Sequence, residues 1–515
     1  MISPVAGDDE WLPRPIAAAV IAAALGTFGW HALVGFQGGY LDHVSGVWLS
    51  LARDLSEGVL VRDLTSDLGY GGTRYFPLFF SAIAGLLTLG TPITVAGWLV
   101  AAASLVLLTI GTFRAARALG VPPWTSGVFG AAAGASYFVQ QTIFEIRADV
   151  MAAAFNMWGL AFVLPAWRQP AADREYRTGA AALFFTLAFA TKVTALAIPG
   201  AVTLAAVLTR RGRLGAELAG KVGAGSVVFL IVVELASEGR ALAVWGACML
   251  GGSDASMTAA GFFSAGFLAG LRQSYQLAVL ALVAVGALAS AIVLPADSKA
   301  RGSRAWIVPL AIWTGASATL AVTLSSPGTV PSNQVVEWIA VCLLVPVLVA
   351  APRRRIRGLT AAIVAAVTIW MAVQDLSRAA EVPRSTSERE GVQARILRRL
   401  EALPAPVLTE SALWPILAGR EVIMPDPFAA RVVFGSRPDL ESVLLNEVRT
   451  HRYSAVILEF DPSSREGRGV YDNLHFGPTV MRAILEGYRL EEPPSGGPWV
   501  YLPRERARFD TPGRR

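Results

Sequence analysis

Long apolar blocks recur along the first three-quarters of the chain, and short clusters of arginine separate them. A helix that crosses a bilayer needs about 20 mostly apolar residues. The chain is 54% hydrophobic and only 16% charged, whereas a soluble protein would carry about a quarter charged residues. The net charge of +6 is explained by arginines in loops and not by a nucleic-acid-binding stripe. The sequence therefore predicts a polytopic α-helical membrane protein.

The blocks predict about 11 transmembrane helices. They run over Pro13–Val34, Pro92–Phe113, Trp124–Thr142, Val150–Trp167, Gly179–Ala190, Thr194–Leu208, Val222–Leu235, Ser274–Leu294, Ala305–Leu324, Val335–Val349 and Leu359–Val373. The block Phe76–Leu89 is short for a crossing and favours a re-entrant or interfacial helix. The first block lacks the flanks of a removed signal peptide, so we expect it to be retained.

Basic residues set the predicted orientation, because loops on the cytoplasmic side are enriched in Lys and Arg. With Phe76–Leu89 left uncounted, the basic clusters of five successive loops fall on one side. The N-terminus is then cytoplasmic, and the long loops face outward. We expect a multi-pass membrane protein whose C-terminal domain lies outside the cytoplasm.

A more polar region follows the last apolar block, so we predict a membrane domain over residues 1–375 and an extracytoplasmic domain over 376–515. A helix is expected over Glu388–Ala402, strands over Val407–Thr409, Ala455–Phe460 and Trp499–Leu502, and a helix over Thr479–Tyr488. This alternation is typical of a small α/β domain. The tail after Arg504 is expected to be disordered.

Asp42 lies a few residues past the first span, at the start of a predicted amphipathic helix that ends near Glu57. The apolar face of this helix suits a membrane interface. Asp42 is either only the N-cap of the helix or an acid held at a fixed height above the bilayer.

Glu145, Arg147 and Asp149 share one short outward loop, and charges at a membrane boundary are costly unless solvated, paired or used. Arg147 could simply pair with Asp149, or these groups could contact a substrate. Lys192 lies between two short apolar segments and suits a phosphate, because it is a compact cation. Its alternative role is to end a short helix at the interface.

Asn333 and Glu337 are four residues apart, so they share one helix face near an outward turn. They could line a substrate cavity or hold two helices together. All four features fall on one side of the predicted topology. A carboxylate could take a proton from an acceptor hydroxyl as a general base. Lys192 or Arg147 could stabilise a departing phosphate.

The order of these features resembles the C-type (GT-C fold) membrane glycosyltransferases, in particular bacterial members of the protein O-mannosyltransferase and lipid A aminoarabinose transferase superfamily. Asp42 in GYLDHVSGVWLSLARDLSEG, with Tyr75-Phe76-Pro77-Leu78 further on, resembles the first outward loop of that superfamily. Asp149 in EIRADVMAAAF resembles the acid of its second loop, and Thr191-Lys192 resembles its Thr-Lys pair. The run that holds Asn333 and Glu337 resembles a later outward segment.

The resemblance implies a glycosyltransferase that moves a hexose or pentose from a polyprenyl-phosphate donor to a glycan, lipid or protein hydroxyl, with inversion and an aspartate base. Its catalytic residues would be Asp42 and Asp149. The substrate-binding residues would be Lys192, Arg147, Glu145, Asn333, Glu337 and Tyr75. Many relatives carry two acids where this chain has Asp42-His43, which favours a mechanism without a metal or other cofactor. Membrane lipids are expected partners, and nucleic acid is not.

The principal alternative is a membrane transporter or a flippase for a lipid-linked glycan, which would also place charges at membrane depth. Transporters often have two related halves with interrupted helices in matching positions, and the sequence contains no such pairing. A large later loop rich in Arg and His would favour a polysaccharide polymerase or ligase. The loop from about Ala236 to Gln273 contains only Arg240 and Arg272 and no His, which argues against this alternative. A scaffold that uses its C-terminal domain to bind a partner is the third alternative.

Overall fold

The computed structural model describes residues 10–36, 41–67, 69–167, 171–250, 275–293, 307–324, 335–379, 382–491 and 498–504. The chain forms two compact units. The helical unit comprises Met1–Leu41, Tyr75–Ala236 and Ala255–Thr386, and the α/β unit comprises Asp42–Arg74, Ser237–Asp254 and Ser387–Arg515. Each unit is therefore assembled from segments that lie far apart in the sequence.

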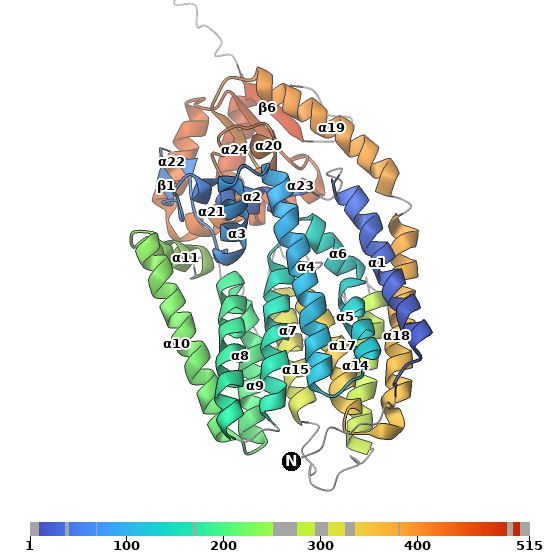
Figure 1. The fold of residues 1–515 in the computed structure, drawn as a ribbon. Helices are drawn as coiled ribbons and strands as arrows, with labels where there is room; N and C mark the ends of the chain where they lie inside the picture. Colours follow the sequence, from blue (N-terminus) through green and yellow to red (C-terminus); the bar gives the residue numbers. More distant parts are fainter. Residues whose placement is uncertain are drawn as a thin grey trace, which may run out of the picture. The chain divides into compact units, whose positions relative to one another are not determined.

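The helical unit consists of long helices that pack side by side, with α8 between α7 and α10, and α1 against α18 (Figure 1). Its elements are α1 (Arg14–Phe36), α3 (Leu78–Thr88), α4 (Ile93–Ala118), α5 (Pro123–Gly134), α6 (Tyr137–Phe144), α7 (Asp149–Ala166), α8 (Ala171–Thr191), η1 (Val193–Leu196), α9 (Ala197–Leu208), α10 (Gly212–Ala236), α14 (Tyr275–Val293), α15 (Ile307–Leu324), α17 (Val336–Ala350) and α18 (Arg354–Ala379).

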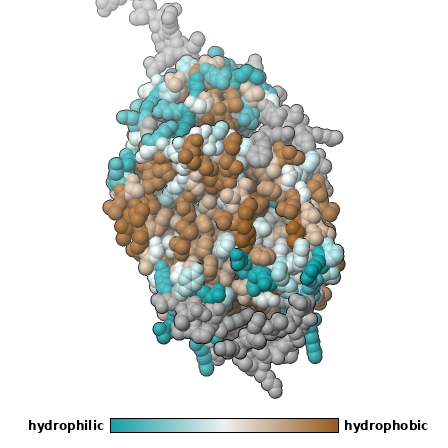
Figure 2. Space-filling view, in the orientation of Figure 1, coloured by the Kyte–Doolittle hydropathy of each residue, from teal (hydrophilic) through white to brown (hydrophobic). Residues whose placement is uncertain are grey.

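The exposed sides of these helices are largely apolar, as the brown atoms over them in Figure 2 show. Leu33 of α1, Leu183 of α8 and Leu235 of α10 are among the large apolar side chains that are more than half exposed. Such surface is costly in water and favourable in lipid. Six helices in the described part of the chain are long and apolar enough to cross a membrane. These features are those of a multi-span membrane protein.

The predicted third span is wrong, because Trp124–Thr142 is not one helix. The structure has α5 up to Gly134 and α6 from Tyr137, and Ser136 between them has extended backbone. The Ser136 hydroxyl donates to Gln276 at the start of α14. The block Phe76–Leu89 forms the short helix α3, which is one of four shorter apolar helices that accompany the six long ones within the described ranges. A count of about 11 crossings stays a prediction.

A buried histidine–aspartate contact joins the first and the last helix of the helical unit in sequence order. The imidazole of His31 on α1 lies 2.7 Å from the Asp375 carboxylate on α18, and both side chains are almost wholly buried. The rings of His31 and Phe144 stack with their centroids 6.2 Å apart. A polar group in such surroundings is costly unless it has a partner, so this contact favours the pairing of α1 with α18.

The α/β unit contains a four-stranded sheet in the order β3-β4-β6-β5. Strands β3 and β4 are parallel, and the other neighbours are antiparallel. Its elements are β3 (Val407–Thr409), β4 (Ala455–Leu458), β5 (Tyr488–Leu490), β6 (Trp499–Pro503), α11 (Ala241–Leu250), α19 (Val382–Ala402), α20 (Leu413–Leu417), α21 (Pro427–Ser436), α22 (Pro438–Arg449), α23 (Arg465–Asn473) and α24 (Pro478–Gly487).

The predicted α/β character of this region is confirmed. Strands β3, β4 and β6 and helix α24 lie where the sequence predicted them, and the last two turns of α19 pack on the sheet through Ile396 and Leu400. Strand β5 was missed, because its short run, Tyr-Arg-Leu, has an exposed arginine at its centre. The domain boundary near residue 375 stays a prediction.

The first loop of the chain folds onto this C-terminal region. Helix α2 (His43–Ser56) packs against α20, where the backbones of Gly46 and Leu413 are in close contact. A short hairpin follows, formed by β1 (Thr65–Ser66) and β2 (Gly69–Tyr70). The amide of Tyr70 donates a hydrogen bond to the backbone carbonyl of Ile423.

Arg62 makes a second contact between the first loop and the C-terminal region. Its guanidinium makes two hydrogen bonds to the Asp54 carboxylate, at 2.6 and 2.7 Å, and a third to the carbonyl of Val422 at 2.7 Å. A bidentate arginine–carboxylate pair fixes both distance and orientation. Arg53, in α2 of the same loop, donates a hydrogen bond to the carbonyl of Arg420.

Helix α2 begins and ends where the sequence predicted, with Asp42 as N-cap and Glu57 as C-cap. Its position at the membrane interface stays a prediction, but both of its faces are covered. Val47, Trp48 and Leu51 are buried in protein, and so are the polar residues Ser50 and Asp54. The amphipathic pattern of α2 thus serves packing inside the protein.

The contact at Gly46 yields a prediction about the α/β unit. A Cβ at this position would lie 2.1 Å from the Leu413 amide nitrogen, so Gly46→Ala must push α2 away from α20. We expect it to lower the free energy of unfolding by about 1–3 kcal/mol, as overpacking does. Denaturant unfolding of the purified protein measures this. Gly391→Ala in α19 is the control, because nothing lies near that glycine, and it should be neutral or slightly stabilising. Equal stability of both variants would contradict the predicted clash.

Candidate active site

Lys192 and Asp149 meet in the helical unit. Asp149 is the first residue of α7, where a carboxylate is favoured by the helix dipole. Lys192 lies at the break between α8 and η1, with extended backbone. Its ammonium nitrogen is 2.5 Å from Asp149 Oδ1, and about a quarter of the lysine side chain is exposed. The pair is therefore a cation held in place by an acid and still open on one side.

A second polar contact lies two turns further along α7. The Asn156 amide donates to the Glu337 carboxylate at the start of α17 and, at 3.0 Å, to the carbonyl of Ala195 in η1. The contacts of Asn156 join α7, η1 and α17 beside the Lys192 turn. Sequence reasoning missed Asn156, although an asparagine inside the apolar run MAAAFNMWGL is a usable signal.

The loop between α6 and α7 is buried together with its charges. Arg147 is only 1% exposed, and its guanidinium lies 2.6 Å from the Glu145 carboxylate. Gln141 also donates to Glu145 at 2.6 Å. Between the two charges, Ile146 has a φ of 50°, a left-handed conformation that is rare for a β-branched residue. Arg147 therefore pairs with Glu145, whereas Asp149 pairs with Lys192.

Tyr75 lies in the helical unit just before α3 and is half-buried. Its neighbour Phe76 packs edge-to-face on Phe189 of α8, with centroids 5.1 Å apart. Phe189 is on the last turn of α8, which ends just before Lys192. The Phe76 contact thus brings the segment of Tyr75 to the same end of α8 as the Lys192–Asp149 pair.

Asp42 belongs to the α/β unit and closes a capping box at the start of α2. Its Oδ1 accepts hydrogen bonds from the amide and the hydroxyl of Ser45, both at 2.8 Å, while its own amide donates to the Ser45 hydroxyl. Such reciprocal bonds fix the orientation of the N-cap side chain. The structure thus confirms the predicted cap, which is compatible with a second role for the same carboxylate.

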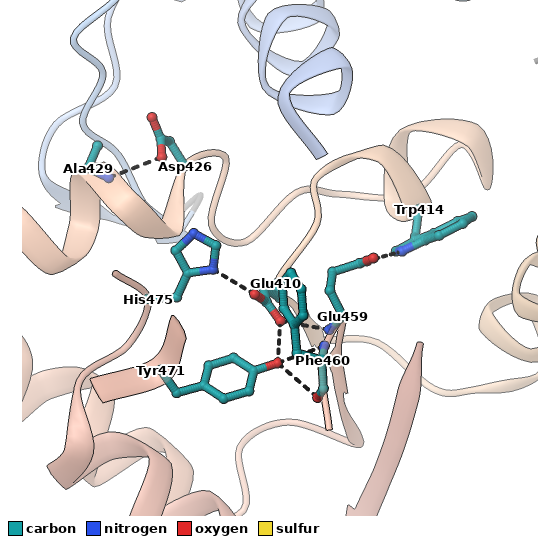
Figure 3. Close-up of polar contacts among 8 residues, drawn as sticks. All are labelled: Glu410, Trp414, Asp426, Ala429, Glu459, Phe460, Tyr471 and His475. Carbon is teal, nitrogen blue, oxygen red and sulfur yellow. Dashed lines mark hydrogen bonds and ion pairs between the residues drawn. The ribbon is translucent and has the colours of Figure 1, made fainter. Parts of the chain in front are cut away.

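A cluster of acids around His475 and Tyr471 lies in the α/β unit, and the sequence analysis did not single it out (Figure 3). Glu410 follows β3 and Glu459 follows β4, so both stand at the carboxyl edge of the parallel strand pair. Glu410 is completely buried. It accepts hydrogen bonds from the Tyr471 hydroxyl at 2.7 Å and the Glu459 amide at 2.7 Å, and it contacts His475 Nδ1 at 2.6 Å.

The two carboxylates of this cluster differ in their affinity for protons. Burial would raise the pKa of Glu410, but the hydrogen bond and charge of His475, with the Glu459 amide and the Tyr471 hydroxyl, lower it overall. Desolvation, followed by the Glu410 charge, raises the pKa of Glu459 to about 7. Trp414 donates to Glu459 and opposes this rise. Two acids with separated proton affinities often mark a functional site, although structural ion pairs also produce them.

Of the predicted site residues, Asp149, Lys192, Arg147, Glu145, Glu337 and Tyr75 lie in the helical unit, and Asp42 lies in the α/β unit. Asn333 falls outside the described residues. Among the residues that the structure does describe, no group of three or more His, Cys, Asp or Glu side chains is arranged to hold a metal ion.

Comparisons with known proteins identify the fold. No family model matches the chain, and no curated sequence matches it. Among solved structures, ArnT from Cupriavidus metallidurans in the apo state is similar at a TM-score of 0.59 and 13% identity, over 93% of this chain and 97% of that one. ArnT bound to undecaprenyl phosphate is similar at 0.58 and 13%, over 94% and 97%.

The Archaeoglobus fulgidus oligosaccharyltransferase, tethered to an acceptor peptide with an NVT sequon, is similar at a TM-score of 0.50 and 11% identity, over 94% of this chain and 74% of that one. These proteins have the GT-C fold of membrane glycosyltransferases. The predicted fold class is therefore confirmed.

The buried Arg147–Glu145 pair leads to a stability prediction. Arg147→Met removes the positive charge beside the buried Glu145 carboxylate, so we expect a loss of about 3 kcal/mol in the free energy of unfolding. Lys221→Met is the control, because Lys221 and Glu217 form a partly exposed pair and such pairs contribute below about 1 kcal/mol. Thermal unfolding in detergent, followed by tryptophan fluorescence, compares the two. A smaller drop in Tm for Arg147→Met than for Lys221→Met would contradict the prediction.

Proposed function

We propose that this chain is a glycosyltransferase that moves a monosaccharide, a hexose or a pentose, from a polyprenyl-phosphate donor to a hydroxyl acceptor at the outer face of the bacterial cytoplasmic membrane. The N-terminus is cytoplasmic in this proposal. The fold supports it, because ArnT and the oligosaccharyltransferase have the same fold. The ArnT structure with undecaprenyl phosphate supports a lipid-phosphate donor.

The observation that carries the proposal is the Lys192–Asp149 pair. Lys192 stands at a break between two helices, is partly exposed, and is paired with the Asp149 carboxylate. A phosphate that enters beside it can share or take over this cation. A lysine suits that role, since its ammonium is a compact charge with three donors. Asp149 keeps Lys192 oriented when no phosphate is bound.

Asp42 is the proposed base. It takes the proton from the acceptor hydroxyl, whose oxygen then forms a bond to the anomeric carbon of the sugar. The bond between that carbon and the phosphate oxygen breaks, with inversion, and polyprenyl phosphate leaves with the electron pair. A base of this kind contributes about 10²–10⁴-fold to the rate. Lys192 stabilises the charge that develops on the phosphate.

The remaining predicted residues have supporting roles in this proposal. Glu337, held by Asn156, and Asn333 and Tyr75 contact the substrates. The buried Arg147–Glu145 pair holds the loop that carries Asp149. The acceptor is a glycan, a lipid or a protein, and the reaction uses neither a metal nor another cofactor.

The test uses the full-length protein in nanodiscs with a panel of undecaprenyl-phosphate hexoses and pentoses, and a cell-envelope extract as acceptor. Release of undecaprenyl phosphate is measured by mass spectrometry. We expect one donor to be consumed, with a loss of about 100-fold or more in Asp42→Asn, because a general base is removed. Lys192→Met should weaken use of the donor more than use of the acceptor.

Asp67→Asn is the matched control for Asp42→Asn, because Asp67 is an exposed acid on the same loop, and it should keep full activity. Failure of every donor would overturn the proposed reaction. Asp42→Asn activity equal to that of Asp67→Asn would remove Asp42 as the base. Movement of an intact donor between the leaflets of proteoliposomes, with no release of undecaprenyl phosphate, would instead support a flippase.

A further inference from the structure

His43 follows the proposed base directly and meets a second histidine. The rings of His43 and His475 lie 5.5 Å apart between centroids and are tilted by 46°. His43 is at the start of α2, and His475 is in the turn between α23 and α24. Residues from the two ends of the α/β unit thus meet beside Asp42.

His475 is held firmly on its other side. Its Nδ1 contacts Glu410 at 2.6 Å (Figure 3), and Glu410 is held in turn by Tyr471 and by the backbone of Glu459. Phe476 and Gly477 have φ angles of 59° and 85°, a left-handed turn that follows His475 directly. Such a turn is energetically costly at a non-glycine residue. The orientation of the His475 ring is therefore fixed by both its backbone and its partner.

Not every polar atom of this cluster is satisfied. Both carboxylate oxygens of Glu410 have partners. In contrast, His43 Nδ1 and Asp426 Oδ2 are buried and make no hydrogen bond to the part of the chain that the structure describes. The other oxygen of Asp426 caps α21 through the amide of Ala429. Buried polar atoms in a purely structural cluster are nearly always paired. The two exceptions point to a functional role for this end of the cluster.

The charges around His43 oppose one another. Burial lowers the pKa of His43, and the positive charge of His475 lowers it further, while Asp426, Glu410 and Asp42 raise it. The net effect is a lowered pKa, so His43 is neutral at neutral pH. A cation directly beside Asp42 would stabilise its carboxylate and make it a weaker base. A neutral His43 avoids this.

We propose that His475, held by Glu410, is a positioning residue for proton transfer at Asp42, because its ring lies against the ring of His43, the residue next to Asp42. The inference rests on the proposed function in one respect, that Asp42 takes the proton from the acceptor. The C-terminal region then contributes directly to the reaction. As the pH falls, His43 takes up a proton, Asp42 becomes a weaker base, and the transfer rate declines.

The first arm of the test needs no activity. The chain contains only four histidines, so deuterium exchange at each imidazole C2–H, followed by mass spectrometry across a pH series, reports each one separately in the full-length protein. His475→Asn should shift the titration of His43 to higher pH, because the interaction with His475 that lowers the pKa of His43 is lost. Asp426→Asn should shift it to lower pH, because a negative neighbour is lost, and asparagine can still cap α21.

His451→Asn is the matched control. His451 belongs to the same unit but contacts the carbonyl of Gly487 and the ring of Tyr488, so its replacement should leave the titration of His43 unchanged. His475→Lys places an ammonium group beside Glu410, so the pKa of His43 should stay lowered. An identical His43 titration in wild type, His475→Asn and Asp426→Asn overturns the proposed coupling.

The second arm is the pH profile of sugar transfer. In His475→Asn the acid limb should move to higher pH, with a loss of about 3–10-fold near pH 6 and little change near pH 8. A merely structural role would lower the rate by the same factor at every pH, and that result also overturns the proposal. If the wild type transfers no sugar, the proposed function fails. The deuterium-exchange experiment still decides whether His475 affects the titration of His43.

Discussion

The helical unit depends on one constraint, that a charge among apolar helices needs a partner because the surrounding medium cannot solvate it. The unit meets this constraint at His31–Asp375, at Arg147–Glu145 and at Lys192–Asp149. The first two pairs are buried and join or shape the helices. The third is partly exposed, and it stands where α8 ends and η1 begins. This difference in exposure separates the two buried pairs from the Lys192–Asp149 pair, in which we propose that a phosphate can replace the carboxylate as the partner of Lys192.

The α/β unit depends on a different interaction, the packing of the first loop onto the C-terminal sheet region. Arg62 bridges Asp54 and the carbonyl of Val422, and Gly46 lets the backbone of α2 approach that of α20. These contacts bring Asp42 and His43 beside His475 and Glu410, although more than 360 residues separate them in the sequence. The C-terminal region is thus part of the environment of the proposed base.

The candidate site could be predicted in part from the sequence. Asp42, Asp149 and Lys192 stand out because each is a charge at the end of an apolar block, and the structure places Asp149 and Lys192 in direct contact. Glu410 and His475 carry no such signal, since acids and histidines are ordinary in a polar domain. A buried strand that ends in an acid, as β3 does at Glu410, is a weak indication at most. The assignment of Arg147 to Glu145 instead of Asp149 depends on the turn at Ile146, which no pattern in the sequence predicts.

The sequence by itself determined the elements whose cause is local. Apolar length specifies the membrane helices, an N-cap specifies the start of α2, and a run of Val, Ile and Leu specifies β3 and β4. It misjudged Trp124–Thr142, because the break at Ser136 depends on contacts outside that block, such as the bond to Gln276. Only the tertiary structure decided which face of α2 is enclosed, which acid holds which cation, and that His43 meets His475. These outcomes depend on distances between segments remote in the sequence, and local pattern contains no information about such distances.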